Sequence, residues 1–148
     1  SEGEQKNVIL YCKPANVKVS VVYTEDFLKY YSDCTVSLST SHLTAPFEVN
    51  MKKDSGKDAY LKANADGEKV SITVGGFRDK EGNEVVMEAL VAEKKVAPKT
   101  HLTITVDPEV ITISTGTASL DVTVDTGTED KDVNIEIPEE YWPGNASK

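Results

Sequence analysis

The sequence contains few of the residues that carry most enzyme and metal chemistry. It has two histidines, two cysteines and one tryptophan in 148 residues. The histidines and cysteines are His42, His101, Cys12 and Cys34. Their positions match no zinc-binding spacing. Ser41-His42 with Asp33 would supply the groups of a hydrolase triad, but no nucleophile elbow accompanies them. We therefore expect a protein that is not an enzyme and that uses neither a metal nor a cofactor.

Long hydrophobic runs are also missing. The longest, Val8 to Cys12, has five residues, whereas a membrane-spanning helix needs about 20. Hydrophobic residues still make up 39% of the chain, which is too many for a disordered protein. The length suits one well-buried core, or one core with an appendage. The polar start SEGEQKN is typical of a processed or truncated chain.

Positive charge is scarce in the last third of the chain. The net charge is -9, from 25 acidic and 16 basic residues, which disfavours binding to nucleic acid. Residues 1–106 hold 15 acidic and 14 basic residues, whereas residues 107–148 hold 10 and 2. This shift predicts a β-sandwich domain over 1–106 and an acidic extension over 107–148. The extension either docks on the sandwich or starts a second β-domain.

That acidity has more than one interpretation. A solvated sheet surface is the simplest, and a surface for a cation or a basic partner is the alternative. The acidic turns at 79–84 and 125–132 would supply some calcium ligands, although most such turns are only solvated. The two cysteines are similarly ambiguous. An oxidising compartment would permit a Cys12–Cys34 disulfide, but two buried free thiols are the favoured state.

Apolar residues alternate with polar ones through most of the chain. Val17, Val19, Val21 and Tyr23 share one face of a strand. The apolar run at 8–12 predicts a strand before it, and similar patterns predict further strands at 34–40, 47–51, 59–61, 70–74, 85–91, 102–106, 111–113, 120–124 and 133–137. Gly75-Gly76 is expected to end the strand over 70–74. About ten short strands at this spacing predict an all-β antiparallel sandwich, immunoglobulin-like or transthyretin-like.

One short helical turn interrupts the strands. Thr24 is a good N-cap, acidic residues follow it, and Phe27 and Tyr31 meet at helical spacing. We expect this turn to plug one end of the sandwich with aromatic rings.

Two aromatic pairs are candidates for binding a glycan. Tyr30-Tyr31 and Tyr141-Trp142 offer flat apolar faces with polar handles, which suit a sugar ring. The alternative is structural: Tyr30-Tyr31 would fill the core, and Tyr141-Trp142 would dock the C-terminal strand.

Three segments together resemble a known family. They are CKPANVKV at 12–19, YTEDFLKYY at 23–31 and DCTVSL at 33–38. They are similar to a family of Bacteroidales envelope lipoproteins catalogued as domain of unknown function 4493. That family has a CxxANVKV strand, an F/L-x-x-x-F/Y turn and a D-Y-T-V-x-V strand. A later strand of the family ends in H-x-T-I, which His101 to Ile104 matches, so the resemblance covers about residues 6–106.

The resemblance implies a place in the cell but no activity. It implies an extracytoplasmic protein at the outer membrane or cell surface, anchored by a lipid upstream of this chain. Cys34 stands where the family often has an aromatic residue. The family's usual preceding β-domain is absent from this sequence. The family is similar to adhesins and pilus-related subunits of the same bacteria, and it has no site residues to carry over.

We therefore expect a non-enzymatic adhesion or structural module of a bacterial cell-surface lipoprotein. A glycan-binding module is one alternative. A pilus subunit assembled by strand donation is another, in which Val133 to Ile137 completes a neighbouring subunit. The expected partner is a surface glycan or a protein receptor, and the oligomeric state stays open.

Overall fold

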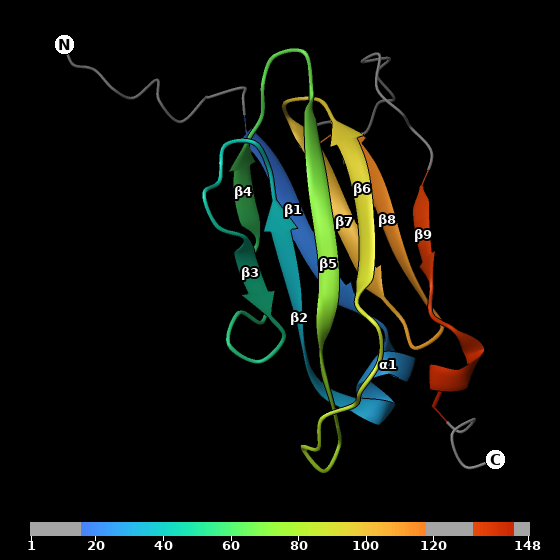
Figure 1. The fold of residues 1–148 in the computed structure, drawn as a ribbon. Helices are drawn as coiled ribbons and strands as arrows, with labels where there is room; N and C mark the ends of the chain where they lie inside the picture. The colour runs from blue at the N-terminus through green and yellow to red at the C-terminus, as the bar shows by residue number, and fades with distance from the viewer. Residues whose placement is uncertain (1–15, 118–131, 144–148) are drawn as a thin grey trace.

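Two β-sheets stacked face to face form the body of the protein (Figure 1). This computed structural model describes residues 16–117 and 132–143. The predicted all-β sandwich is confirmed. The strands predicted at 8–12 and 120–124 lie outside the described residues. No helix in the described parts of the chain is long and apolar enough to cross a membrane.

The larger sheet has five strands in the order β4-β1-β7-β8-β9. These are β4 (Ala59–Lys62), β1 (Asn16–Tyr23), β7 (Thr100–Val106), β8 (Val110–Thr117) and β9 (Val133–Glu136). Neighbouring strands are antiparallel except β1 and β7, which run parallel from Lys18 beside His101 to Tyr23 beside Val106. Parallel neighbours need a long connection. Here the connection between β1 and β7 includes the whole second sheet.

The second sheet has four antiparallel strands in the order β3-β2-β5-β6. These are β3 (Phe47–Asn50), β2 (Tyr31–Ser39), β5 (Glu68–Asp79) and β6 (Leu90–Val96). Strands β2 and β5 form the centre of this sheet, and β3 and β6 are its edges (Figure 1).

The hydrophobic core lies between the two sheets, because each strand turns alternate residues inward. The largest fully buried side chains are Phe27, Phe77, Leu38, Ile72, Leu102, Ile104, Ile111 and Ile113. Ile111, Ile113 and Ile137 follow Asp107-Pro108, so residues beyond that point contribute to the same core. The boundary predicted at 106/107 itself remains a prediction.

Strand β5 continues through Gly75-Gly76, so the prediction that these glycines end the strand is wrong. Val74 and Phe77 both point inward, which leaves the two glycines between them as a bulge. Gly76 has a φ of 67°, a conformation that glycine adopts without strain. The pairing with β2 is irregular in the same region, around Asp33.

The return strand β6 begins at Leu90, so its predicted start at Val85 is also wrong. Residues 85–89 form no regular strand, and Val86 is exposed. The true strand contains Lys94 at an inward, buried position. A lysine at that position interrupts the apolar alternation by which the strand could have been recognised.

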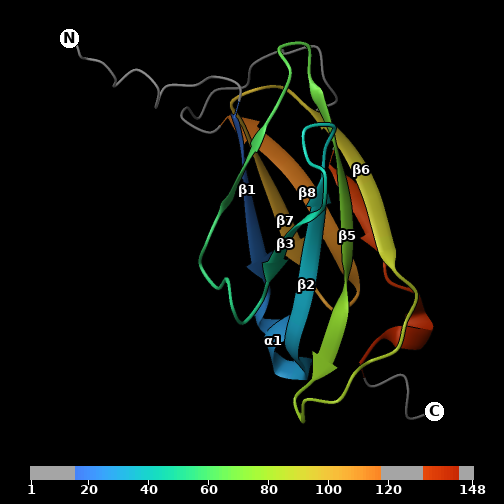
Figure 2. The same cartoon turned by 60° about the vertical axis from the view of Figure 1, so that its left-hand side comes forward.

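The predicted helical turn is confirmed as α1 (Glu25–Tyr30), at the end of the sandwich where β1 ends and β2 begins (Figure 2). The Thr24 hydroxyl accepts a hydrogen bond from the Phe27 amide at 3.1 Å and donates one to Asp107 at 2.9 Å. The Phe27 ring stacks on Tyr31, with centroids 4.6 Å apart, and on Tyr23 at 5.7 Å. A 3-10 turn, η2 (Glu139–Tyr141), follows β9.

Candidate functional site

The structure separates the first predicted aromatic pair. Tyr31 is 5% exposed and belongs to the core, whereas Tyr30 is 47% exposed on α1. Burial also raises the pKa of the Tyr31 phenol above its ordinary value. Only Tyr30 has a ring that is open to a ligand, so these two residues do not form a joint platform.

The second aromatic pair is half-buried against the core. The Trp142 indole Nε1 donates a hydrogen bond to the Ile137 carbonyl at 2.7 Å. This contact fixes η2 beside the end of β9. Strand donation would offer β9 to a neighbouring subunit. In this structure β9 is paired with β8 of the same chain. Strand donation would have to break that pairing, and it stays a prediction.

Cys34 is a buried free thiol, and Cys12 lies outside the described residues. Burial raises the pKa of Cys34 to about 12, and the nearby Tyr23 phenol offsets only part of this rise. The pKa of Tyr23 is raised as well, by its own burial and by Cys34. The thiol is therefore protonated at neutral pH, which makes it a poor nucleophile.

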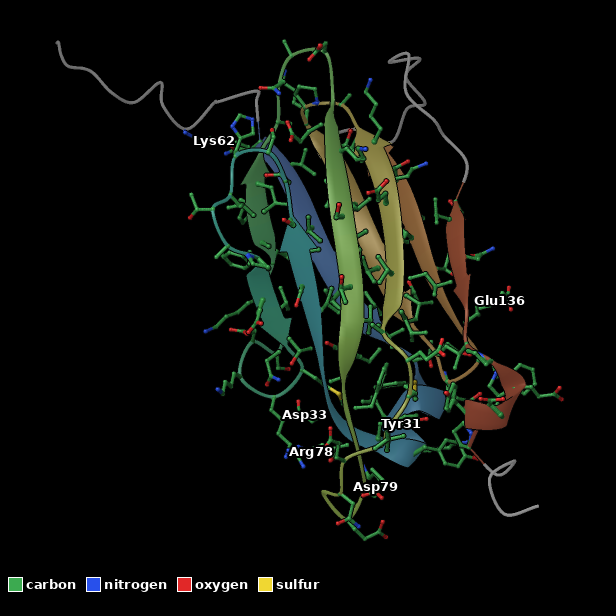
Figure 3. The ribbon with its side chains drawn as sticks, in the orientation of Figure 1. Tyr31, Asp33, Lys62, Arg78, Asp79 and Glu136 are labelled. Atoms are coloured by element: carbon green, nitrogen blue, oxygen red, sulfur yellow. The ribbon has the colours of Figure 1, made fainter. Side chains whose placement is uncertain are left out.

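The groups of the conceivable hydrolase triad do not assemble. Asp33 lies at the end of the molecule opposite Lys62 (Figure 3). His42 approaches Asn64, two residues beyond Lys62, with 3.1 Å from Nε2 to the Asn64 Oδ1. Ser41 hydrogen-bonds to Glu68 rather than to a histidine.

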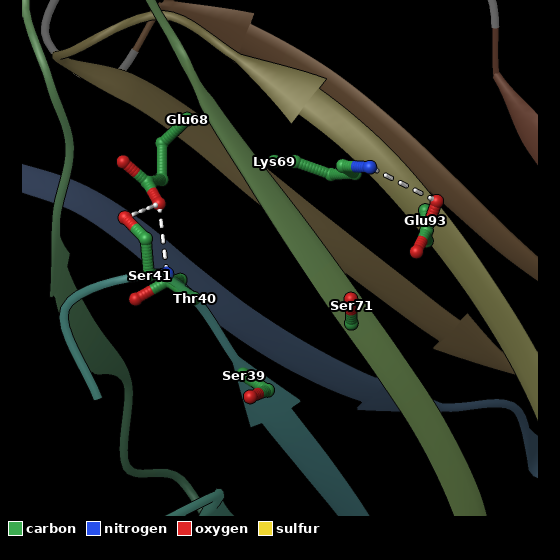
Figure 4. A pocket seen from close by; sticks show the side chains of 7 residues that line it. All are labelled: Ser39, Thr40, Ser41, Glu68, Lys69, Ser71 and Glu93. Atoms are coloured by element: carbon green, nitrogen blue, oxygen red, sulfur yellow. Dashed lines mark hydrogen bonds and ion pairs between the residues drawn. The ribbon is translucent and has the colours of Figure 1, made fainter. Parts of the chain in front are cut away.

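A shallow hollow of about 330 Å³ opens beside Glu68 on the outer face of the four-stranded sheet (Figure 4). It is lined by Ser39, Thr40, Ser41, Glu68, Lys69, Ser71 and Glu93. The Glu68 carboxylate is directed to Ser41, and the Lys69 ammonium lies 3.8 Å from the Glu93 carboxylate (Figure 4). The charged groups of this hollow are thus paired with groups of the protein itself.

A second polar group of residues, which we name the edge cluster, lies on the outer face of the five-stranded sheet. Its members are Lys18, Ser20, Asp58, Tyr60 and His101. In the register, Lys18 stands between Tyr60 of edge strand β4 and His101 of β7. The Ser20 Oγ donates to the Asp58 Oδ1 at 2.8 Å and lies 2.7 Å from the His101 Nε2. The Lys18 ammonium lies 3.5 Å from the other Asp58 oxygen.

The edge cluster holds an exposed aromatic ring next to these polar groups. Tyr60 is 62% exposed, whereas its strand neighbours Ala59 and Leu61 are buried. The exposed ring therefore shares one face of the sheet with a partly exposed ion pair, a hydroxyl and an imidazole, and Lys18 is its partner in the register. Lys18 and Ser20 lie on β1, Tyr60 on β4 and His101 on β7, so backbone pairing fixes their positions, and Asp58 directly precedes β4.

The order of hydrogen bonds in the edge cluster does not activate Ser20. In a hydrolytic triad the histidine stands between the serine and the acid, and it removes the hydroxyl proton. Here the serine stands in the middle. Because the Ser20 hydroxyl donates to Asp58, its contact with His101 requires a hydrogen on Nε2. The imidazole then donates to Ser20 and is not a base toward it.

Sequence reasoning missed the edge cluster. The alternation in Ala59-Tyr60-Leu61 does indicate that Tyr60 points outward. Lys18 and His101 lie about 40 positions before and after Tyr60 in the chain, and they join the cluster because β4 pairs with β1 and β1 with β7. Such a register is not visible in the alternation of one strand.

The two acidic turns considered as calcium ligands are at 79–84 and 125–132. In residues 16–117 and 132–143, no three His, Cys, Asp or Glu side chains gather closely enough to hold a metal ion. In the turn at 79–84, the Asp79 Oδ1 accepts hydrogen bonds from the amides of Glu81 and Asn83. Residues 125–131 lie outside the described part.

The family assignment follows from comparison of the whole sequence. Residues 1–139 match the family described as Domain of unknown function (DUF4493). The chain belongs to this family. The match continues past Asp107-Pro108 and confirms the resemblance seen in the sequence motifs. No curated protein and no solved structure matches the chain. The family description names no activity, so the function has to be argued from the structure.

Proposed function

We propose that this domain is a non-enzymatic adhesion and spacing module of an extracytoplasmic bacterial lipoprotein. In this role it holds neighbouring parts of the protein apart at the cell surface and withstands tension between them. A lipid anchor upstream of this chain would attach the protein to the outer membrane.

One observation carries the proposal: the first and last described strands lead out of opposite ends of the sandwich. Asn16, at the start of β1, lies at one end, and η2, after β9, lies at the other (Figures 1 and 2). Segments joined before β1 and after η2 are therefore separated by the full length of the strands. This arrangement suits a spacer.

The pairing of these strands also suits a load-bearing role. Tension between the two ends pulls β1 lengthwise against β7, and β9 lengthwise against β8. The β1–β7 register runs over six residue pairs, and the β8–β9 register over four. Backbone hydrogen bonds between strands lie across the strand direction, so such a pull loads many of them at once. A pull across the strands would instead open them one after another.

Single-molecule force spectroscopy tests this proposal by comparing two pulling geometries. In the first, handles are attached at residues 16 and 143. In the second, they are attached at residues 16 and 99, which lie together because the Lys99 amide donates to the Asn16 carbonyl at 2.8 Å. We expect a clearly higher rupture force in the first geometry, which shears β1, than in the second, which peels it away. Equal rupture forces would contradict the load-bearing role.

A further inference from the structure

The edge cluster offers a ligand site on the face of the five-stranded sheet, and this inference rests on the adhesion part of the proposed function. We propose that the edge cluster binds a neutral saccharide, with a sugar ring stacked on Tyr60 and its hydroxyl groups bonded to Asp58 and Lys18. Exposed apolar side chains scattered singly are common on protein surfaces. The distinctive feature here is the set of hydrogen-bonded polar groups on the same face of the sheet as the ring.

The ring and the polar groups are the two parts that a sugar requires. A sugar ring presents a face of C–H groups and an edge of hydroxyls. The 62% exposed Tyr60 ring supplies an apolar surface for the first. Asp58 supplies acceptor oxygens and Lys18 supplies donors for the second. Lys18 pairs with Tyr60 in the register, and its ammonium lies 3.5 Å from the Asp58 carboxylate.

Charge pairing favours a neutral ligand over an ionic one. The Asp58 carboxylate already faces the Lys18 ammonium and accepts from Ser20, so the carboxylate and ammonium charges compensate each other. Each of these groups can form further hydrogen bonds, since a carboxylate has about four acceptor sites and an ammonium three donors. Hydroxyl groups use that remaining capacity without bringing an uncompensated charge.

The surface beyond Tyr60 can accept a chain rather than a single sugar. His101 lies two strands away from Tyr60 in the same row, about 10 Å at the usual strand spacing. The next row places Ser20 beside Thr103, and Thr103 beside Ser114. A row of hydroxyls beside the row that holds the aromatic ring matches a linear oligosaccharide lying across the strands. A protein partner would instead need a larger apolar patch at its centre.

Affinity electrophoresis and calorimetry with defined polysaccharides test this site. The probes are neutral amylose, β-glucan, xylan and galactomannan, with hyaluronan and polygalacturonate as the anionic comparison. We expect saturable binding to at least one neutral polymer. Tyr60→Ala should weaken that binding by about tenfold or more, from the lost stacking. Asp58→Asn should weaken it as well, whereas Tyr60→Trp should retain it.

Tyr30→Ala is the matched control, because Tyr30 is also an exposed tyrosine but lies on α1, outside the edge cluster. It should bind like the unmodified protein, and circular dichroism should show that all variants remain folded. No binding to any neutral polymer, or equal loss in Tyr60→Ala and Tyr30→Ala, would overturn the proposal. Preference for the anionic polymers would also overturn it. A protein that binds no saccharide yet resists pulling at residues 16 and 143 would leave the spacing function intact.

Discussion

The Glu68 carboxylate accepts two hydrogen bonds from Ser41, one from its amide at 3.0 Å and one from its hydroxyl at 2.7 Å. Glu68 is 4% exposed, although it is charged, and its other oxygen accepts from the Asn64 amide at 3.3 Å. The carboxylate thus joins the loop after β2 to the turn before β5. Buried charges are stable only with such partners.

Replacing Glu68 should therefore destabilise the fold. Glu68→Gln keeps the shape but weakens the charge-assisted hydrogen bonds, and we expect a loss of about 1–3 kcal/mol in the free energy of unfolding. Chemical denaturation followed by circular dichroism measures it. Glu93→Gln is the matched control, since Glu93 is exposed and forms only a surface ion pair; its effect should stay below about 1 kcal/mol. Equal effects of the two substitutions would show that Glu68 does not hold the loops.

The contribution of Glu68 to the free energy of unfolding should decrease at low pH. Burial acts to raise its pKa, but the hydrogen bonds from Ser41 and Asn64 and the nearby His42 lower it below the ordinary 4.5. A carboxylate whose pKa is lower in the folded state stabilises the protein above the unfolded-state pKa. That stabilisation is lost as pH falls through the folded-state value.

The stability difference between the unmodified protein and Glu68→Gln should therefore narrow as the pH falls below about 4.5. Urea titrations at several pH values measure both proteins side by side. A difference that stays the same or grows below pH 4.5 would contradict the assignment of Glu68 as a charged, hydrogen-bonded group.

The sequence predicted the elements whose signals are local. The capped turn after Thr24 has its N-cap, its acidic first turn and its aromatic spacing within eight residues, and the structure reproduces it. The strand alternations likewise predicted most of the sandwich. Lys94 is the clearest exception, because a lysine at an inward position reverses the expected pattern of β6.

The candidate site could not be predicted in the same way. The edge cluster joins Lys18, Asp58 and His101 through the β4-β1-β7 order. That order depends on which strands become neighbours within a sheet, and many different pairings of strands are compatible with the same apolar–polar alternation. The parallel contact of β1 with β7 was especially hidden, since short loops between strands indicate antiparallel neighbours.

Cys34 should be unreactive in the folded protein. At pH 8 a thiol with a pKa of about 12 is ionised in about one molecule in ten thousand, and the side chain is fully buried. In a Cys12→Ser background, a chromogenic disulfide reagent should label Cys34 only as fast as the protein unfolds. Full labelling in urea is the control. Rapid labelling in native buffer would show that the β1–β2 end of the core opens readily.

The aromatic stack around Phe27 should be the most sensitive part of the core. The ring is fully buried and lies between Tyr23 and Tyr31. Phe27→Ala should cost about 3–5 kcal/mol, which is a large part of the stability of a typical domain. Phe27→Leu should cost less and fold. Leu28→Ala, at the next and exposed position of α1, should change the stability by under about 1 kcal/mol. Thermal unfolding of the three variants gives the ranking, and a similar loss for Leu28→Ala would contradict it.

The bulge in β5 provides a pair of adjacent glycines with different requirements. Gly76 has a φ of 67°, whereas the φ of Gly75 lies outside the left-handed region and a side chain there would meet nothing within 4 Å. The Cβ of an alanine at Gly76 would lie 3.6 Å from the Thr35 hydroxyl, which is an ordinary contact. The expected loss of stability therefore comes from backbone strain and not from a clash.

Gly76→Ala should therefore lower the free energy of unfolding by about 1 kcal/mol or more, from strain at a positive φ. Gly75→Ala should be close to neutral or slightly stabilising, because it restricts the unfolded chain without straining the folded one. Both variants add the same methyl group at adjacent positions. A difference between their denaturation midpoints therefore reports the difference in backbone strain. Equal midpoints would mean that β5 can straighten at this point. The inward positions of Val74 and Phe77 argue against that, because a regular strand would turn one of them out of the core.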